Sequence, residues 1–201
     1  MTRQILRLGF LASRNGTSFR EIVRATAAGE LAAEPLLLVS NNRSAEALTF
    51  ATDHGVASRH IPTQGDPEAA DTELATVMAK AGVELIVLSG YLRHLGPVTL
   101  ERFRNRIVNV HPSLLPEFGG EGMYGRRVHE AVIAAGARTS GATVHLVDEV
   151  YDRGAILAQR AIELDPSETV ESLEARVTAL EPELFVETLR QIASGDLVLP
   201  P

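Results

Sequence analysis

The stretch that decides the fold is residues 83–95, VELIVLSGYLRHL, in which Leu85–Leu88 is the clearest buried strand of the chain. A strand that is apolar at every position is covered on both faces, as in a parallel sheet flanked by helices. From residue 5 to residue 110, short apolar runs of this kind alternate with amphipathic stretches. This alternation predicts a Rossmann-like α/β fold, with a mostly parallel twisted sheet, helices on both faces and right-handed crossovers.

The pattern of apolar residues changes after Val110. The strands predicted up to that point are 5–11, 36–39, 56–61, 85–88 and 107–110. The predicted helices are 18–28, 44–54 with Ser44 as N-cap, 67–81 and 97–103. Beyond Val110, a loop rich in Gly and Pro (112–125) leads to a helix (126–135), and strands 143–147 and 155–162 form a hairpin-type pair or a bend. The last helix, 170–193, is expected to be interrupted near Pro182 because proline lacks a backbone N–H.

Composition limits the classes of function. The chain has 201 residues, of which 45% are hydrophobic, so we expect one domain over residues 1–201 with a sizeable core. The net charge is −7, which argues against nucleic acid and anionic membranes as partners and favours small molecules. The chain has no cysteine, which excludes disulfides and thiolate nucleophiles and fits a reducing compartment.

The amino terminus reads as a strand and not as a targeting segment. No apolar stretch approaches the ~20 residues that a transmembrane helix needs. Arg7 interrupts the apolar run of residues 1–11, and Ser13–Gly16 is no small-residue cleavage site of a signal peptide. We therefore expect a cytoplasmic protein.

The turn Ser13-Arg14-Asn15-Gly16-Thr17-Ser18 comes directly after the first strand and opens the first helix. Backbone N–H groups at a helix N-terminus attract anions, and Gly16 lets the backbone approach a ligand closely. The turn is neither a dinucleotide motif nor a P-loop, so a single phosphate monoester is the ligand that it would suit. An ordinary N-capped turn between strand and helix is the alternative.

Asn109 and His111 lie two residues apart at the carboxyl end of a central strand, so their side chains point to the same face. Ligands of open α/β sheets bind at that edge. Acyl transfer needs an amide that donates to a developing oxyanion and an imidazole that moves a proton, and this pair supplies both. The alternative is a strand end whose histidine caps a loop.

Other polar segments allow several interpretations. The run from His145 to Gly154 holds four carboxylates or imidazoles within eight residues. It could bind a metal, supply a carboxylate to His111, or form a solvated acidic turn, and its spacing matches no helix-face pair of metal ligands. The loop Gly90–Leu95 could line a pocket for a flat ring. Glu181 reads by itself as a surface carboxylate, and three further histidines are interpreted as ordinary surface or loop residues: His54, His60 and His129.

The motifs together resemble those of the folate-dependent formyltransferases. The most specific is Asn109-Val110-His111-Pro112-Ser113-Leu114-Leu115-Pro116, and the resemblance extends to residues 15–18, 90–95, 143–145 and 152–154. The stretch 118–125, FGGEGMYG, is similar to a variant loop in the same family. The resemblance implies formyl transfer from 10-formyltetrahydrofolate to the amine of glycinamide ribonucleotide, without a metal, by a monomer or homodimer.

The resemblance also implies roles for individual residues. Residues 1–100 would be the phosphate-binding half and residues 101–201 the catalytic and folate-binding half. Asn109, His111 and Asp152 would be catalytic, with Asn109 donating to the formyl oxygen and Asp152 keeping His111 protonated enough to act as an acid. The substrate would contact Gly16, Thr17, Ser18, Pro112 and Glu181. The folate would contact Leu92, Arg93, His94, Leu95, Asn109, Asp148, Glu149, Val150, Tyr151 and Asp152.

The sequence departs from the family pattern at four places. Arg14 stands where Gly is usual, Ser18 where Asn is common, and Pro182 where His follows the glutamate. Segment 62–73 lacks the arginine that often contacts folate in this family. Other acceptors therefore stay open, namely water, an amino sugar nucleotide or initiator methionyl-tRNA, as does a nucleotide-sensing domain that binds without turnover.

Overall fold

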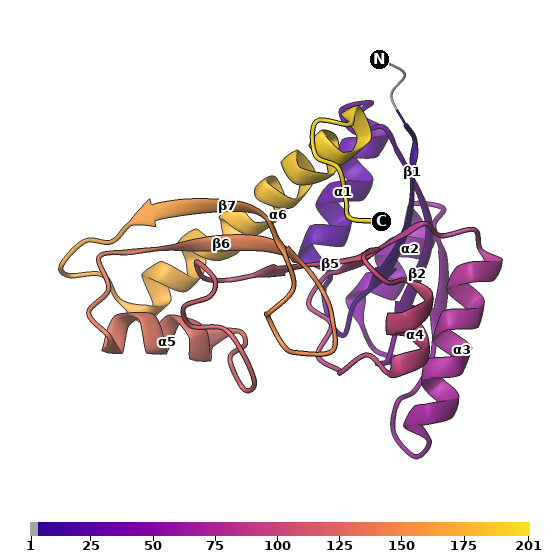
Figure 1. The fold of residues 1–201 in the computed structure, drawn as a ribbon, viewed down its shortest axis with the longest axis horizontal. Helices are drawn as coiled ribbons and strands as arrows, with labels where there is room; N and C mark the ends of the chain where they lie inside the picture. Colours follow the sequence, from indigo (N-terminus) through magenta and orange to yellow (C-terminus); the bar gives the residue numbers. More distant parts are fainter. Residues whose placement is uncertain (1–3) are drawn as a thin grey trace.

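The computed structural model describes residues 4–201, so Met1–Arg3, the start of the segment for which a signal peptide was considered and rejected, lie outside the described residues. One seven-stranded sheet has the order β3-β2-β1-β4-β5-β6-β7 (Figure 1). The first five strands pair in parallel, while β6 pairs antiparallel with β5 and with β7. The strands are β1 (Leu6–Leu11), β2 (Ala33–Ser40), β3 (Ala57–His60), β4 (Leu85–Leu88), β5 (Ile107–His111), β6 (Thr139–Leu146) and β7 (Ile156–Glu163). The predicted α/β class and mostly parallel sheet are confirmed.

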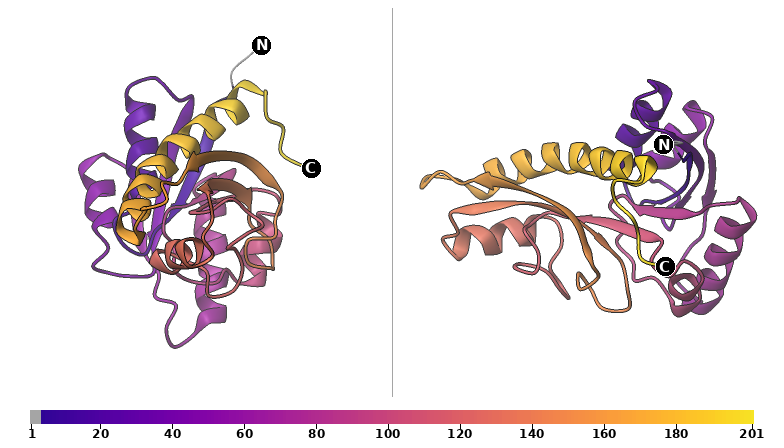
Figure 2. Two further views of the ribbon diagram at one scale, coloured as in Figure 1. Left: turned by 90° about the vertical axis from the view of Figure 1, so that its left-hand side faces the viewer. Right: turned by 45° about the horizontal axis from the view of Figure 1, so that its top comes forward.

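Helices cover both faces of the sheet. They are α1 (Thr17–Ala27), α2 (Glu46–Asp53), α3 (Pro67–Lys80), α4 (Pro97–Arg102), α5 (Arg126–Ala134) and α6 (Val170–Ser194). The apolar residues of α1, α2 and α6 belong to one buried cluster, and those of α3 belong to a second cluster. Figure 2 shows α6 running back from the β6–β7 end of the sheet to the amino-terminal half, where it packs against α1.

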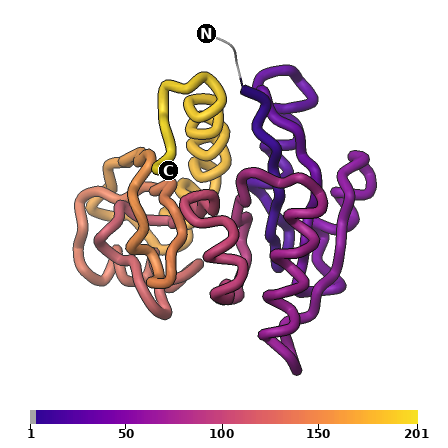
Figure 3. The backbone as a smooth tube through the Cα atoms, turned by 45° about the vertical axis from the view of Figure 1, so that its right-hand side comes forward, coloured from indigo at the N-terminus to yellow at the C-terminus, as the bar shows by residue number. Residues whose placement is uncertain are grey.

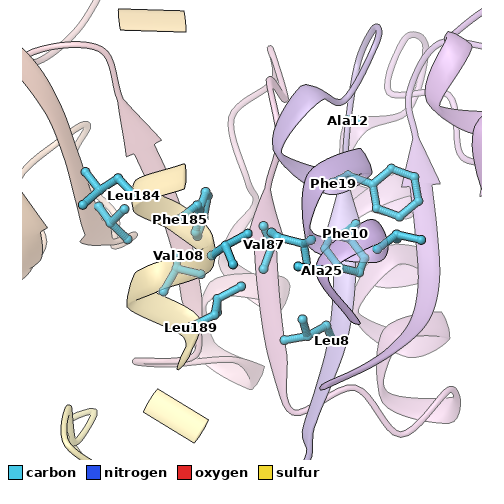
Figure 4. Close-up of a cluster of buried hydrophobic side chains, with 14 of the residues drawn as sticks. Leu8, Phe10, Ala12, Phe19, Ala25, Val87, Val108, Leu184, Phe185 and Leu189 are labelled. Atoms are coloured by element: carbon cyan, nitrogen blue, oxygen red, sulfur yellow. The ribbon is translucent and has the colours of Figure 1, made fainter. Parts of the chain in front are cut away.

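Alternation along β1 explains why both layers form. Leu8 and Phe10 belong to the cluster under α1 and α6, whereas Leu11 belongs to the cluster under α3. Phe10 packs against Phe19 of α1 with ring centroids 4.7 Å apart (Figure 4). Burying such side chains contributes about 1.5–3 kcal/mol each to stability. Apolar packing on both faces therefore stabilises the sheet without any contribution from the polar residues at its edge.

Strand β5 lies where the parallel and antiparallel parts of the sheet meet. Its Asn109 is directly opposite His145 of β6, and His111 is opposite Thr143. Directly opposite residues of an antiparallel pair have close side chains. The pairing of β6 with β7 shifts register between Val144 and His145, and such irregularities re-aim side chains at the ends of strands.

Three local predictions were wrong. Ser44 is not the N-cap of α2, because its hydroxyl and its N–H both donate to Asn42 Oδ1, and Ala45 takes the cap position. Strand β6 begins at Thr139, four residues before the predicted start, because pairing with β7 recruits its polar and small residues. Helix α6 continues through Pro182. A proline inside a helix costs about 3 kcal/mol, and buried residues on both sides of it, including Val177 before it and Phe185 after it, hold the helix together.

Gly154 lies where the β6–β7 connection closes on the end of β6. A Cβ at Gly154 would lie 1.9 Å from the carbonyl oxygen of Leu146, which is a backbone atom that cannot move aside. We expect Gly154→Ala to lower the free energy of unfolding by about 1–3 kcal/mol, as over-packed positions do. Urea denaturation measures this, and an unchanged midpoint would contradict the described approach of the two segments.

Both ends of the described chain lie near the amino edge of the parallel strands. Gln4 N–H donates to Ala193 O at 3.0 Å, and the side-chain amide of Asn105 donates to Pro201 O at 2.8 Å. Figure 3 shows the carboxyl-terminal segment turning back beside α6 after that helix ends. Gln4 and residues 197–199 line the same groove. Within residues 4–201, no helix combines the length and the apolarity needed to cross a bilayer.

Candidate active site

A cavity of about 1180 Å³ lies along the carboxyl edge of strands β1–β5. It gathers residues from both halves of the chain, as expected for a ligand site of an open α/β sheet. The predicted site residues that line it are Gly16, Thr17, Ser18, Leu92, Arg93, His94, Leu95, Asn109, His111, Pro112, Asp148, Val150, Tyr151, Asp152 and Glu181. Glu149 is not among them. Asp148 Oδ1 accepts the N–H of Val150 at 2.9 Å, and this tight turn leaves Glu149 exposed at its tip.

Asn109, His111 and Asp152 converge although 41 residues separate the last two. Asp152 Oδ2 lies 3.5 Å from His111 Nδ1. The His111 Nε2–H donates to the carbonyl oxygen of Phe118 at 2.8 Å. The imidazole is only 3% exposed, so its protonation depends on these neighbours and not on bulk water.

Burial lowers the pKa of His111, and it outweighs the carboxylate of Asp152 and the Phe118 carbonyl, which both raise it. Asp152 therefore raises the pKa of His111, as expected from the sequence. The net shift of that pKa is nevertheless downward, because burial has the larger effect. The imidazole is mainly neutral at pH 7 and can accept a proton before it gives one.

Two residues of the site have positive backbone φ angles. Asp152 has φ 57° and Phe118 has φ 56°, values that are uncommon outside glycine. Gly120 N–H donates to Asp152 Oδ2 at 2.9 Å, which ties the loop after β5 to the loop after β6. These conformations aim the Asp152 carboxylate and the Phe118 carbonyl at His111, and backbone strain of this kind clusters at functional sites.

The loop after β5 is anchored to the sheet by β6 and β7. Thr143 Oγ1 donates to Ser113 O and accepts the N–H of Leu115 at 3.0 Å. The side-chain amide of Gln159 donates to Leu115 O at 2.8 Å and to Thr143 Oγ1 at 2.9 Å. Sequence reasoning gave Thr143 and Gln159 no role, because their positions depend on strand pairing that local patterns do not reveal.

His145 is a further member of the site, which the sequence placed only in the polar run 145–154 without a catalytic role. It is 2% exposed, and its Nε2 lies 3.2 Å from Asn109 Nδ2 and 3.6 Å from Asp152 Oδ1. Burial lowers the pKa of His145. The signals in the sequence were its place in the polar run 145–154 and its place in residues 143–145, which resemble a family motif.

The turn of residues 13–18, called the phosphate turn after the ligand that the sequence predicts for it, has the geometry of an anion site. Gly16 adopts φ 68° at the N-cap of α1. The N–H of Phe19 donates to Ser89 Oγ, whereas the N–H groups of Thr17 and Ser18 meet no backbone or side-chain acceptor among residues 4–201. Free N–H groups at a helix N-terminus suit a phosphate.

Ser13 connects the phosphate turn to the neighbouring loops. Its hydroxyl donates to Asn41 Oδ1 at 2.7 Å and accepts the N–H of Leu92 at 2.8 Å. On the far side of the cavity, the ring of His94 packs edge-on against Tyr151 with centroids 5.0 Å apart. The loops after β1, β4 and β6 are therefore fixed relative to one another.

Two histidines interpreted as ordinary surface or loop residues have other environments. His60, at the end of β3, lines the cavity. His129 on α5 is 2% exposed, and burial lowers its pKa. Its Nδ1 is buried without a hydrogen-bond partner among residues 4–201. Among residues 4–201, no cluster of three or more His, Asp or Glu residues is arranged as a metal site.

Glu181 reaches the cavity from α6, and burial raises its pKa to about 7. Between its ordinary pKa and pH 7, the folded state binds the proton that the unfolded state has lost, so stability falls as the pH rises through that window. We expect Glu181→Gln to melt at a higher temperature than the wild type at pH 8. The difference should shrink towards pH 5, and thermal unfolding across this range tests it. A difference independent of pH would show that Glu181 is ionised in the folded protein throughout.

Comparison with known proteins gives concordant matches. The model of the formyl transferase family matches residues 6–189. The chloroplastic phosphoribosylglycinamide formyltransferase of Vigna unguiculata is 38% identical over 194 residues, which cover 96% of this chain and 62% of that protein. The phosphoribosylglycinamide formyltransferase of Bacillus subtilis strain 168 is 34% identical, with 90% of this chain and 91% of that protein covered. This chain thus spans just under two thirds of the plant relative's length.

The same likeness holds in three dimensions. The crystal structure of glycinamide ribonucleotide transformylase 1 from Symbiobacterium toebii superposes with a TM-score of 0.89 at 32% identity. The match covers 98% of this chain and 91% of that chain, so it includes both the phosphate turn and the loops around His111.

Proposed function

Because the chain belongs to the formyl transferase family, we propose that it transfers the formyl group of 10-formyltetrahydrofolate to the amine of glycinamide ribonucleotide, a step of purine biosynthesis. The observation that carries this proposal is the meeting of Asn109, His111 and Asp152 in one cavity with an anion-binding turn. A phosphate and a reacting amine of one substrate would then be held from opposite halves of the chain.

The acceptor's phosphate is proposed to bind at residues 16–18. The free N–H groups of Thr17 and Ser18 and the dipole of α1 favour an anion there. Arg14 and Arg43 line the same end of the cavity, and neither forms an ion pair among residues 4–201. Arg14, which departs from the family pattern, thus adds positive charge where the substrate is negative. Glu181, which lines the same cavity, is proposed to contact the substrate.

The folate is proposed to bind between the loops after β4 and β6. Leu92, Val150 and Tyr151 line the cavity with large apolar side chains that are 48%, 60% and 47% exposed, and such a lining suits a flat ring. Backbone groups of residues 92–95 and 148–152 can read the ring's polar edge. No folate contact is proposed for an arginine of residues 62–73, because that segment has none.

Each catalytic group has one proposed task. Asn109 Nδ2–H donates to the formyl oxygen as it gains negative charge during attack by the amine. His111, which burial keeps mainly neutral, takes the proton that the amine loses and gives it to the departing folate nitrogen. Asp152 stabilises the imidazolium that exists between these two proton transfers. The formyl group thus ends on the amine, the proton ends on the folate nitrogen, and His111 is neutral again.

The proposal is tested with the purified full chain, 10-formyltetrahydrofolate and glycinamide ribonucleotide. We expect formylated product in step with deformylated folate, and a much poorer reaction with the dephosphorylated acceptor, because the phosphate turn would be empty. Absence of product would refute the proposed acceptor. Release of formate without acceptor, or formylation of an amino sugar nucleotide, would instead identify the alternative transfers that the same catalytic group could perform.

We propose that the protein acts on small molecules in the cytoplasm, as a single domain and as a monomer or homodimer. The acidic net charge of −7 and the absence of cysteine support small-molecule partners and a reducing compartment. Size-exclusion chromatography with light scattering determines the oligomeric state.

A further inference from the structure

His145 and Asn109 form a direct side-chain contact between neighbouring strands. The two residues are paired opposite each other in the antiparallel register of β5 and β6, and Asn109 Nδ2 lies 3.2 Å from His145 Nε2. The contact lies beside the proposed oxyanion donor and is not explained by the roles of His111 and Asp152. His145 is only 2% exposed, so bulk water competes little for its hydrogen-bond partners.

The other ring nitrogen determines the tautomer of His145. Its Nδ1 lies 2.9 Å from the carbonyl oxygen of Leu146, and a carbonyl oxygen can only accept a hydrogen bond. Nδ1 therefore carries the hydrogen, and Nε2 of the neutral ring has a lone pair. Burial favours the neutral ring. Asp152 Oδ1 is 3.6 Å from Nε2, too far for a hydrogen bond, so it does not compete for that position.

The lone pair on Nε2 of His145 admits only one orientation of the Asn109 amide. The nitrogen of the amide can donate to Nε2, whereas a flipped amide would place its oxygen against another acceptor in a buried position. We infer that His145 is a positioning residue, which holds the Asn109 amide so that its nitrogen, and not its oxygen, serves the formyl group. This inference rests on the function proposed above.

The arrangement leaves a donor for the reaction. An amide nitrogen carries two hydrogens, of which one goes to His145 and the second is free to be donated into the cavity that Asn109 lines. Without His145, the amide turns about its last side-chain bond, and in the flipped orientation its oxygen repels the formyl oxygen. The loss is then one of catalysis and not of substrate binding.

Two substitutions separate positioning from a structural role. In His145→Gln, the side-chain amide reaches the place of Nε2 and its oxygen can accept from Asn109, while the bond to Leu146 is lost. In His145→Asn, the amide reaches only the place of Nδ1, so the bond to Leu146 is kept and the acceptor is lost. We expect His145→Asn to lower kcat about 10- to 100-fold, less than the ~10²–10³-fold typical of a deleted oxyanion donor, with KM changed less than about twofold. His145→Gln should recover most of this loss.

A purely structural His145 predicts the reverse order of the two variants. A His145→Asn enzyme with wild-type kcat, or a His145→Gln enzyme as slow as His145→Asn, would overturn the inference.

An NMR measurement keeps the inference separate from the proposed function. In ¹⁵N-labelled wild type, a coupling through the hydrogen bond should join Asn109 Nδ2 to His145 Nε2, with the ring hydrogen on Nδ1. If the wild type transfers no formyl group, the proposed function fails while this coupling still supports the orientation. A hydrogen on Nε2 of the neutral ring would overturn the orientation even in an active enzyme.

Discussion

Replacement of His111 by alanine is expected to lower kcat for formyl transfer by about 10²–10⁴-fold, because the proton lost by the amine and gained by the folate nitrogen would have no relay. His145 does not replace it. The Nδ1–H of His145 is bound to Leu146 O, and its Nε2 accepts from Asn109. Spectroscopic assay of folate release under saturating substrate measures the loss, and the KM values should change only a few-fold.

The control for this variant is a test that it still folds. His111 is 3% exposed, so its removal also leaves a small cavity and some loss of stability. Thermal unfolding and binding of a folate analogue show whether the variant remains folded and keeps its site. A variant that is folded, binds the analogue and retains kcat within tenfold of the wild type would refute a proton-transfer role for His111.

Substitution of Asn109 should lower kcat by about 10²–10³-fold, the usual effect of removing one oxyanion donor. The informative variant is Asn109→Asp, which keeps the shape of the side chain but can only accept hydrogen bonds when ionised. Its carboxylate would face both the lone pair of His145 and the negative charge that develops on the formyl oxygen. We expect Asn109→Asp to be no faster than Asn109→Ala at pH 8.

The pair of Asn109 variants separates charge from shape. If packing alone mattered, Asn109→Asp would outperform Asn109→Ala, and that outcome would contradict a donor role for the amide. The double variant Asn109→Ala/His145→Asn provides a second check. Because His145 acts only through Asn109, adding His145→Asn to Asn109→Ala should lower kcat little further, as expected for residues that act as a unit.

Local patterns predicted most of the sheet. The strand Leu85–Leu88 was predicted at its observed bounds, because a wholly apolar run of four residues between glycines has few other uses. The helix beginning at Pro67 was also predicted at its observed start, and the structure adds its N-cap, because Asp66 accepts the N–H of Ala69. Local chemistry determines these elements, and tertiary packing only adds to it.

The remaining features depend on partners that are distant in the sequence. Residues 139–142 of β6 are polar or small, and they form a strand only because β7 pairs with them. Pro182 lies within a continuous helix because apolar packing offsets its missing hydrogen bond. His145 became visible as a partner of Asn109 only through the register of β5 against β6, which no single stretch of sequence specifies.

Gln4 and residues 197–199 border one groove at the amino edge of the parallel strands, while the catalytic cavity opens at the carboxyl edge. A second polypeptide tethered to either terminus would therefore leave the mouth of the cavity clear. Because Gln4 and residues 197–199 lie at the same groove, circular permutation, in which a short linker joins the old ends and new ends are cut in an exposed loop away from the cavity, should leave the lining of the cavity intact.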